Sequence, residues 1–284
     1  MKNILIPTDF SENAWNALQY SVTLFKKVPC TFYLLNTYQP AMPLIGANLV
    51  NREGSLRLLQ HMKEDSKNGL EKWMESIQKK FKNPNHHFES ISVEEALVPC
   101  IKKTVKAKAI SLLIMGTKGA SGLTEIFMGS NAVRVIQNMK LCPILAIPEN
   151  IKFVRPKEIA FPTDFHRFFS EGEIKPLVEL TKLFNSSIKI VHINKEETLS
   201  DVQQYNLMML KRHLKTVEHY TYWLPKFEKI SNAITIFVED LDIDLLAMVN
   251  YNQSIIEKIT HEPVIKKIGF KVTVPFLVLP EAGY

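Results

Sequence analysis

The sequence predicts an α/β protein of two tandem domains, each a five-stranded parallel open sheet of Rossmann-like type flanked by helices. Three observations support this prediction. The chain has 284 residues, 46% of them hydrophobic, which is enough for about two domains. Short apolar runs alternate with helical patterns along the chain, and a set of short motifs occurs twice in the same order.

An internal repeat divides the chain into two halves. The segment Ile-Pro-Thr-Asp-Phe at 6–10 returns as Phe-Pro-Thr-Asp-Phe at 161–165, Leu-Leu-Ile-Met at 112–115 returns as Leu-Leu-Ala-Met at 245–248, and the segment 142–149 returns at 274–281. Three matches in one order indicate a duplication. The boundary falls near residues 150–156, so we predict domains at 1–150 and 151–284.

The first half has the pattern of a parallel sheet with crossover helices. We predict strands near 2–6, 31–37, 87–93, 110–115 and 143–147, with helices near 12–26, 55–81, 95–107 and 130–139. In the longest helix, Lys and Glu fill one face and apolar residues recur at helical spacing on the other. We therefore expect this apolar set in the core: Leu56, Leu58, Leu59, Met62, Leu70, Trp73, Met74 and Ile77.

In the second half, residues 233–238 have the composition of a strand but the repeat register of a helix. Aligning Met248 with Met115 places 231–241 on the helix before the fourth strand and moves the third strand to 219–225. We follow the register, because tertiary context overrides local propensity. The last strands, 144–147 and 276–279, are each bracketed by prolines, which is typical of short edge strands.

Composition narrows the classes of function. The chain has 35 Lys and Arg against 29 Asp and Glu, a mild basic excess of +6 that identifies no partner. Its three cysteines, Cys30, Cys100 and Cys142, lack metal-ligand spacing, so we expect buried thiols rather than a disulfide or zinc site. No apolar run approaches the ~20 residues of a membrane span and the amino terminus is not a signal peptide, so we expect a cytoplasmic protein.

A glycine-rich loop follows the predicted fourth strand. Gly116 and Gly119 come directly after the strand, and Gly129-Ser130 opens the next helix. Glycines allow a close approach of the backbone to a ligand, and a helix amino terminus offers amides and the positive dipole end to an anion. Such a loop is often only a turn. However, it lies at the same sheet edge as Asp9, where ligands bind in open parallel sheets.

These residues resemble the universal stress protein (UspA) family, whose fold is a five-stranded sheet like that of the adenine nucleotide alpha hydrolases and whose ATP-binding members carry this glycine spacing. The resemblance implies that Asp9 and Thr37 lie beside the adenine and ribose, and that Gly116 and Gly119 lie beside the ribose and phosphates. It places the phosphates on Gly129, Ser130 and Asn131. The rest of the implied cofactor-binding set is Pro7, Thr8, Met115 and Thr117. Because single-domain members of the family form dimers, the resemblance also implies that the last strands, 144–147 and 276–279, pair with each other within this chain. Asp9 has an alternative structural role, because Pro-Thr-Asp-Phe-Ser is also typical of a turn and helix cap.

The second half keeps Pro162-Thr163-Asp164 but not the glycines. Val249 and Asn252 align with Gly116 and Gly119, and His261-Glu262 aligns with Gly129-Ser130, so we expect an empty site there. A branched side chain would crowd the ligand and a carboxylate would repel phosphate. His192 and His261 lack the spacing of a metal pair, and we interpret them as partly exposed histidines.

Three classes of function remain. The leading hypothesis is a stress-response or regulatory protein that binds ATP, ADP or AMP in its first domain, with Mg²⁺ accompanying ATP. The alternatives are a slow ATPase and an interaction scaffold without a ligand. The sequence shows no catalytic constellation beside the loop and neither a Walker pattern nor GxGxxG. Nucleic-acid binding ranks last, we expect no membrane partner, and a homodimer of the whole chain stays open.

Overall fold

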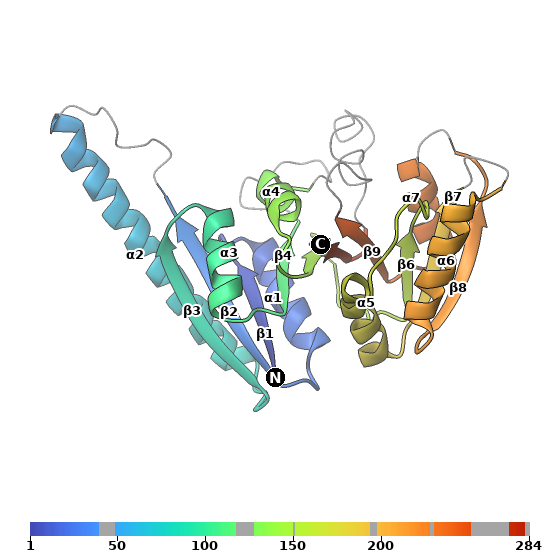
Figure 1. The fold of residues 1–284 in the computed structure, drawn as a ribbon. Helices are drawn as coiled ribbons and strands as arrows, with labels where there is room; N and C mark the ends of the chain where they lie inside the picture. The colour runs from blue at the N-terminus through green and yellow to red at the C-terminus, as the bar shows by residue number, and fades with distance from the viewer. Residues whose placement is uncertain are drawn as a thin grey trace.

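The computed structural model describes residues 1–39, 49–117, 128–149, 151–193, 198–227, 230–250 and 273–281. One continuous sheet of ten strands crosses the molecule in the order β3-β2-β1-β4-β5-β10-β9-β6-β7-β8. Helices cover both faces of this sheet, and the two halves of the chain form its two wings (Figure 1). The fold is therefore an α/β sandwich of three layers, as the sequence predicts.

The first wing contains strands β1 to β5 and helices α1 to α4. Its strands are β1 (Lys2–Pro7), β2 (Cys30–Tyr38), β3 (His86–Glu94), β4 (Leu112–Gly116) and β5 (Ile144–Ile147). Its helices are α1 (Glu12–Leu24), α2 (Leu49–Lys80), α3 (Leu97–Ala107) and α4 (Ser130–Asn138). All four strand pairings inside this wing are parallel, which confirms the predicted order of elements.

The second wing repeats this order. Its strands are β6 (Glu158–Pro162), β7 (Ser187–Ile193), β8 (Glu218–Leu224), β9 (Leu245–Asn250) and β10 (Phe276–Pro280). Its helices are α5 (Glu171–Phe184), α6 (Asp201–Leu214) and α7 (Ile230–Asp240). The β-prone segment 233–238 lies inside α7, which confirms the interpretation from the repeat register over the one from propensity.

Strand pairing shows that the two wings are structural copies. In the first wing Ile4 pairs with Leu112, and in the second wing Ile159 pairs with Leu245. This register makes Pro7 equivalent to Pro162, Met115 equivalent to Met248 and Asn36 equivalent to His192. The sequence alignment of the repeats is therefore also the structural one.

The wings join through their last strands. β5 and β10 pair antiparallel, with Leu145 opposite Leu277, and both strands are fully buried except for Pro280. This is the predicted pairing of the two final strands. Because an antiparallel pair has a local two-fold axis, each structural feature of one wing has a symmetry-related position in the other.

Alternation along the strands divides the core into two apolar layers. One layer includes Ile4 and Leu112 of the sheet together with Ala17, Trp73 and Leu177, from α1, α2 and α5. The other includes Leu5 and Leu113 together with Ile101, Val135 and Phe237, from α3, α4 and α7. Each layer contains residues of both wings, so each face of the sheet is covered by one apolar layer that spans the whole molecule.

One expectation about α2 is wrong. Leu56 and Leu58, expected in the core, are 54% and 53% exposed. The helix has 32 residues, and its amino-terminal part extends past the strands that it covers (Figure 1). Only its later turns pack on the sheet, through Leu70, Trp73 and Ile77. Helical periodicity identifies an apolar face but not how far the supporting sheet reaches.

In the part of the chain that the structure describes, no helix is both long enough and apolar enough to cross a membrane.

Candidate functional site

A cavity of about 390 Å³ opens at the carboxyl ends of β1, β2 and β4 in the first wing. This is the edge where the strand order reverses, since β1 lies between β2 and β4. The predicted residues that line it are Pro7, Thr8, Asp9, Thr37, Met115, Gly116, Thr117, Gly129, Ser130 and Asn131. Gly119 lies outside the described residues. The fold thus brings together segments that are more than a hundred positions apart in the sequence.

The turn after β1 fixes the position of Asp9. Thr8 Oγ1 accepts a hydrogen bond from Phe10 N at 2.9 Å, and Asp9 Oδ1 accepts one from Ser11 N at 3.1 Å. Phe10 has φ 63°, a left-handed conformation in which these short side-chain bonds hold the turn. Ser11, rather than Asp9, caps α1 by accepting from Ala14 N. Asp9 therefore has the predicted turn role while it also lines the cavity.

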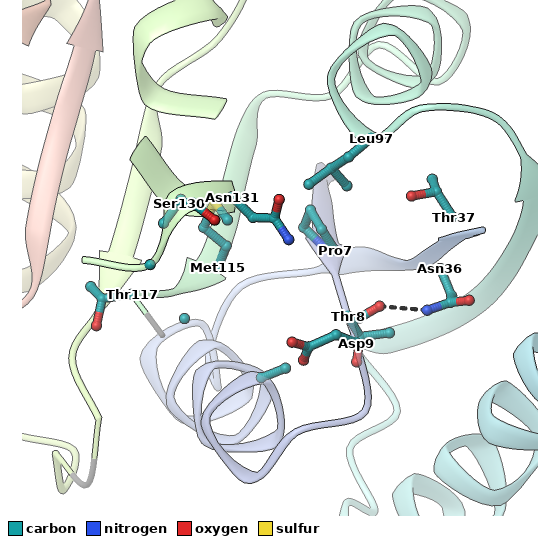
Figure 2. A pocket seen from close by; sticks show the side chains of 14 residues that line it. Pro7, Thr8, Asp9, Asn36, Thr37, Leu97, Met115, Thr117, Ser130 and Asn131 are labelled. Carbon is teal, nitrogen blue, oxygen red and sulfur yellow. Dashed lines mark hydrogen bonds between the residues drawn. The ribbon is translucent and has the colours of Figure 1, made fainter. Parts of the chain in front are cut away.

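Four further residues line the cavity and were not predicted: Ala14, Asn36, Leu97 and Ala132. Asn36 is buried and its Nδ2 donates to Thr8 O at 2.7 Å, which ties the ends of β2 and β1 together (Figure 2). A polar residue ending the apolar run 32–35 was a signal that the sequence offered for Asn36. Leu97 reaches in from α3, and only the tertiary fold brings it there.

Gly116 has a packing reason to be glycine. A Cβ atom built on it would lie 2.6 Å from Asn13 Nδ2 and 3.1 Å from Asn13 O, so the end of β4 can approach α1 only without a side chain. Met115, its neighbour, points to the opposite apolar layer, beside Val135 and Ile136 of α4. The glycine therefore shapes this edge of the sheet, and its place on the cavity wall follows from that packing.

The amino terminus of α4 faces the cavity without a cap from its own side chains. Gly129 is the N-cap and makes no side-chain hydrogen bond, and the first turn contains no acidic residue. By contrast, Ser170 and Glu173 form a complete capping box on α5, and Ser200 and Gln203 form one on α6. The first amides of any helix have no carbonyl partner inside the helix. At α4 these amides and the positive dipole end are directed toward the cavity.

The loop between β4 and α4 is closed at its base. Gly129 N donates to Thr117 O, and Thr117 N donates to Ile147 O at 2.9 Å, so the end of β4 and the start of α4 are tied to each other and to β5. Ser130 and Asn131 then project from the start of α4, and the Asn131 side chain reaches toward Pro7 at the end of β1 (Figure 2). The cavity has donors on one side and, across from them, Asp9 and Thr37.

The cavity combines hydrogen-bond donors with apolar side chains, so it suits a ligand that has both an anionic group and a less polar group. The α4 terminus with the Ser130 hydroxyl and the Asn131 amide offers donors, while Pro7, Leu97 and Met115 offer apolar contact. Across the described ranges, no cluster of three or more His, Cys, Asp or Glu side chains could hold a metal ion.

The second wing repeats the turn that contains Asp9, but a larger side chain, His192, lies beside this turn. Thr163 Oγ1 accepts from Phe165 N, Asp164 Oδ1 accepts from His166 N, and Phe165 has φ 57°. His192 stands where Asn36 stands in the first wing, and its Nδ1 lies 3.0 Å from Thr163 O. Because a carbonyl accepts, this nitrogen carries the proton. The same backbone position is thus held by a larger ring.

Two interpretations of the second wing need correction. His192 is buried rather than partly exposed, and it stacks on Phe165 at 4.8 Å and meets Trp223 edge-on at 5.3 Å. Val249, at the position of Gly116, is buried in the apolar layer that includes Phe169 and Ile174. Its side chain packs into that core, which is the physical reason that the position accepts a branched residue. Asn252, His261 and Glu262 lie outside the described residues.

Comparison with known proteins gives the family. The sequence profile of the universal stress protein family matches residues 1–148, slightly more than half of the chain. The chain belongs to the universal stress protein family. That profile covers the first wing, including the Asp9 turn, the glycine loop and α4, while the second wing is related to the first by the strand register described above.

Individual relatives agree with this membership. A universal stress protein of Methanocaldococcus jannaschii is 29% identical over 148 residues, covering 51% of this chain and 81% of its own. Universal stress protein YxiE of Bacillus subtilis is 24% identical over 148 residues, covering 51% of this chain and 97% of its own. The crystal structure of a universal stress protein from Archaeoglobus fulgidus superposes with a TM-score of 0.70 at 16% identity, covering 99% of this chain and 96% of that one. This last similarity shows that the whole two-winged fold has a counterpart.

Proposed function

We propose that this universal stress protein is a stress-response or regulatory protein that binds one adenine nucleotide, ATP, ADP or AMP, in the cavity of its first domain. The observation that carries the proposal is the amino terminus of α4, whose N-cap is a glycine without a capping side chain and which lies at a cavity of about 390 Å³ at the switch point of the sheet. That volume is within the range of about 300–1,000 Å³ typical of small-ligand pockets.

The cavity residues suggest how the nucleotide would be oriented. Phosphate oxygens would accept hydrogen bonds from the amides that open α4 and from Ser130 and Asn131, where the helix dipole favours negative charge. The ribose and base would then lie toward Thr37 and Asp9, since a carboxylate beside the phosphates would repel them. Gly119, implied by the family resemblance, would add a close backbone approach. Mg²⁺ would arrive with ATP rather than on a protein-built site.

We propose further that the nucleotide is bound and not turned over at a useful rate. Hydrolysis needs a group that positions water and other groups that stabilise charge on the phosphoryl being transferred. Among the described cavity residues, Asp9 is the only carboxylate, and its Oδ1 accepts a bond within its own turn. A slow ATPase is the alternative, and a ligand-free scaffold is the second alternative.

We place the intact site in a domain spanning 1–150 and a degenerate copy in a domain spanning 151–284. In the second copy, His192 and Trp223 add aromatic bulk at the positions of Asn36 and Ser92. We also propose that the protein is cytoplasmic, where adenine nucleotides are available to this site.

Mass spectrometry of small molecules released from the denatured purified protein tests the proposal. Adenine nucleotide in a near-stoichiometric amount would support the binding site. Protein that carries none and shows no heat on titration with ATP, ADP or AMP would favour the scaffold. Phosphate release that depends on Mg²⁺ and disappears in Ser130→Ala would favour the ATPase.

A further inference from the structure

A second cavity, of about 490 Å³, lies between the two wings on the face covered by α1 and α5. Its wall is mainly apolar and comes from both halves of the chain: Lys2, Phe25, Val28, Ser111, Leu112, Pro143, Pro176, Glu179, Leu180, Lys182, Leu183 and Leu277. None of these residues belongs to the nucleotide cavity. Cavities at domain interfaces are common ligand or partner sites.

The local two-fold axis between β5 and β10 relates this cavity to a position that the chain itself fills. Matching side chains fix the alignment of the two helices involved: Ser21 Oγ donates to Ala17 O in α1, and Thr181 Oγ1 donates to Leu177 O in α5. With Ser21 aligned on Thr181, Asn16 of α1 corresponds to Pro176 of α5 and Tyr20 corresponds to Leu180. Both Pro176 and Leu180 line the second cavity.

On α1, the same two positions hold the segment that links the wings, residues 148–157. Asn16 Nδ2 donates to Pro148 O at 3.5 Å, and Tyr20 donates to Val154 O at 3.4 Å. Phe153 meets the Tyr20 ring edge-on at 5.1 Å, and Ile151 packs against the same apolar layer. Burial, and then the nearby Asp244, raise the pKa of Tyr20, so its hydroxyl stays a donor. Residues 151–157 of the linker, which form neither helix nor strand, are therefore held against α1 by these contacts.

The sheet side of the two positions matches as well. Strand register makes Leu112 of the cavity equivalent to Leu245 and Ser111 equivalent to Asp244. Asp244 Oδ2 accepts a hydrogen bond from Lys157 N at 2.8 Å, so Asp244 belongs to the surface on which the linker lies, which we call the linker seat. Pro143 accepts from Leu113 N as Pro275 accepts from Leu246 N, both at 3.0 Å. Leu277 is the symmetry mate of Leu145. The second cavity is thus the two-fold image of the linker seat. Among the described residues, one segment joins the two wings, and it fills one of the two positions.

Charge distinguishes the two positions. The linker carries Lys152 and Arg155, and the Arg155 guanidinium donates to Phe184 O at the carboxyl end of α5. The linker seat supplies Asp244 as a carboxylate. In the image position a neutral Ser111 replaces that carboxylate. On the wall, Lys2 forms a salt bridge with Glu179 at 3.4 Å, and Lys182 adds a second lysine. Exposed Lys26 and Lys27 lie in the chain between Phe25 and Val28 of the wall.

We propose that this second cavity is a docking site for an extended segment of a partner protein, with two apolar side chains spaced like Ile151 and Phe153 and acidic residues where the linker has basic ones. The apolar side chains would fill the space between α1 and α5. The acidic residues would be attracted by Lys182 on the wall and by the neighbouring Lys26 and Lys27. The lining of this cavity shares no residue with the cavity proposed for the nucleotide, so this proposal does not depend on the proposed function.

Amide NMR of the full-length protein tests the site with two hexapeptides as probes. The first has the sequence of residues 151–156 with both basic positions replaced by Glu, and the second keeps the basic sequence. We expect the acidic peptide, titrated to millimolar concentration, to shift amides of residues 25–28, 111–112 and 176–183. The basic peptide should bind several-fold more weakly. Shifts that are absent or lie elsewhere would overturn the proposal, and so would shifts at these amides with dodecanoate but not with the peptide.

Variants on the cavity rim sharpen the test. Lys182→Glu should raise the Kd of the acidic peptide about threefold and lower that of the basic peptide by a similar factor, as expected for one exposed charge pair. Lys175→Glu makes the same charge change on an exposed position of the same helix that does not line the cavity, and it should have a smaller effect. Leu183 lines the cavity and is 37% exposed, so Leu183→Ser should weaken binding of the acidic peptide. Val202→Ser, on α6, should leave that binding unchanged. Equal effects of each variant and its control would refute the docking site.

Discussion

At the scale of single residues, two glycines that line the cavity of the first wing are required for different physical reasons. Gly116 avoids a clash with Asn13, while Gly129 occupies the N-cap of α4, where its lack of a side chain leaves the helix amides open to an anion. The first reason concerns stability and the second concerns the ligand. Substitutions at the two positions should therefore separate in their effects.

Gly129→Glu should abolish nucleotide retention while the fold survives. A carboxylate at the start of α4 would satisfy the helix amides and the dipole itself, and it would repel phosphate. Nucleotide released from the denatured variant measures the effect. The control is Gly172→Glu, which adds the same side chain in the first turn of α5, away from the cavity. Wild-type retention in the Gly129 variant would contradict the assignment of the phosphates to α4.

Gly116→Ala should lower the free energy of unfolding by about 1–3 kcal/mol, because the new methyl group would lie 2.6 Å from Asn13 Nδ2 and force the end of β4 away from α1. Urea denaturation measures this loss. Gly54→Ala is the matched control: a Cβ there meets nothing within 4 Å, and alanine in a helix is favoured by up to about 1 kcal/mol. An unchanged free energy of unfolding in Gly116→Ala would contradict this prediction and show that Asn13 moves to make room for the methyl group.

The three thiols should be unreactive in the folded protein. All three are buried, and burial raises the pKa of Cys30 to about 11 and that of Cys142 to about 12. Since the thiolate is the reactive form, a thiol reagent at pH 8 should modify them only after unfolding. Counting modified thiols with and without denaturant is the measurement. Fast labelling of Cys142 in the native state would contradict this burial.

At the scale of elements, α4 connects the cavity of the first wing to the other wing. Its amino terminus lines the cavity, and near its carboxyl end Ile136 O accepts a hydrogen bond from Nδ2 of the buried Asn250, which ends β9. Carbonyls in the last turn have no partner inside the helix, so Asn250 caps α4 from the second wing. The helix that would hold phosphate is thus supported by both halves of the chain.

Asn250→Ala should destabilise the protein by about 1–2 kcal/mol, since it leaves a buried carbonyl without its donor, and it should weaken nucleotide binding by loosening α4. Urea denaturation and calorimetric titration with ATP measure the two effects. Asn138→Ala removes the Nδ2 donor to Arg134 O on the exposed side of the same helix, and a small effect is expected there. If both variants behave alike, the support from the second wing is not specific.

At the scale of the whole molecule, the β5–β10 pair gives one chain the arrangement of a symmetric pair, but the two halves have diverged. One retains an open cavity with an uncapped helix terminus, and the other has aromatic packing around His192. The linker breaks the symmetry a second time, because it fills one of two related positions.

Calorimetric titration should therefore give a stoichiometry near one adenine nucleotide per chain, with negligible phosphate release. The expected count follows from the second wing, where Phe165, His192 and Trp223 pack against one another beside the repeated turn. Gly129→Glu serves as the control, because it should remove the binding of this one nucleotide. A stoichiometry near two would mean that the second wing also binds nucleotide.

By itself, the sequence determined the α/β class, the duplication and nearly all strand positions, because apolar periodicity is a local signal and the repeat register carries it from one half to the other. The pairing of the last strands was predicted from the resemblance to a family whose single-domain members form dimers. The sequence even placed 233–238 in a helix against its propensity, since the copy in the first half fixed the register. It also named the residues of the Asp9 turn and the α4 terminus that meet in one cavity. Only the tertiary structure decided which distant side chains join them, such as Asn36 and Leu97, and that Leu56 and Leu58 extend past the sheet. It alone revealed the cavity opposite the linker, because that cavity depends on how two wings pack across a two-fold axis, and no local pattern encodes this packing.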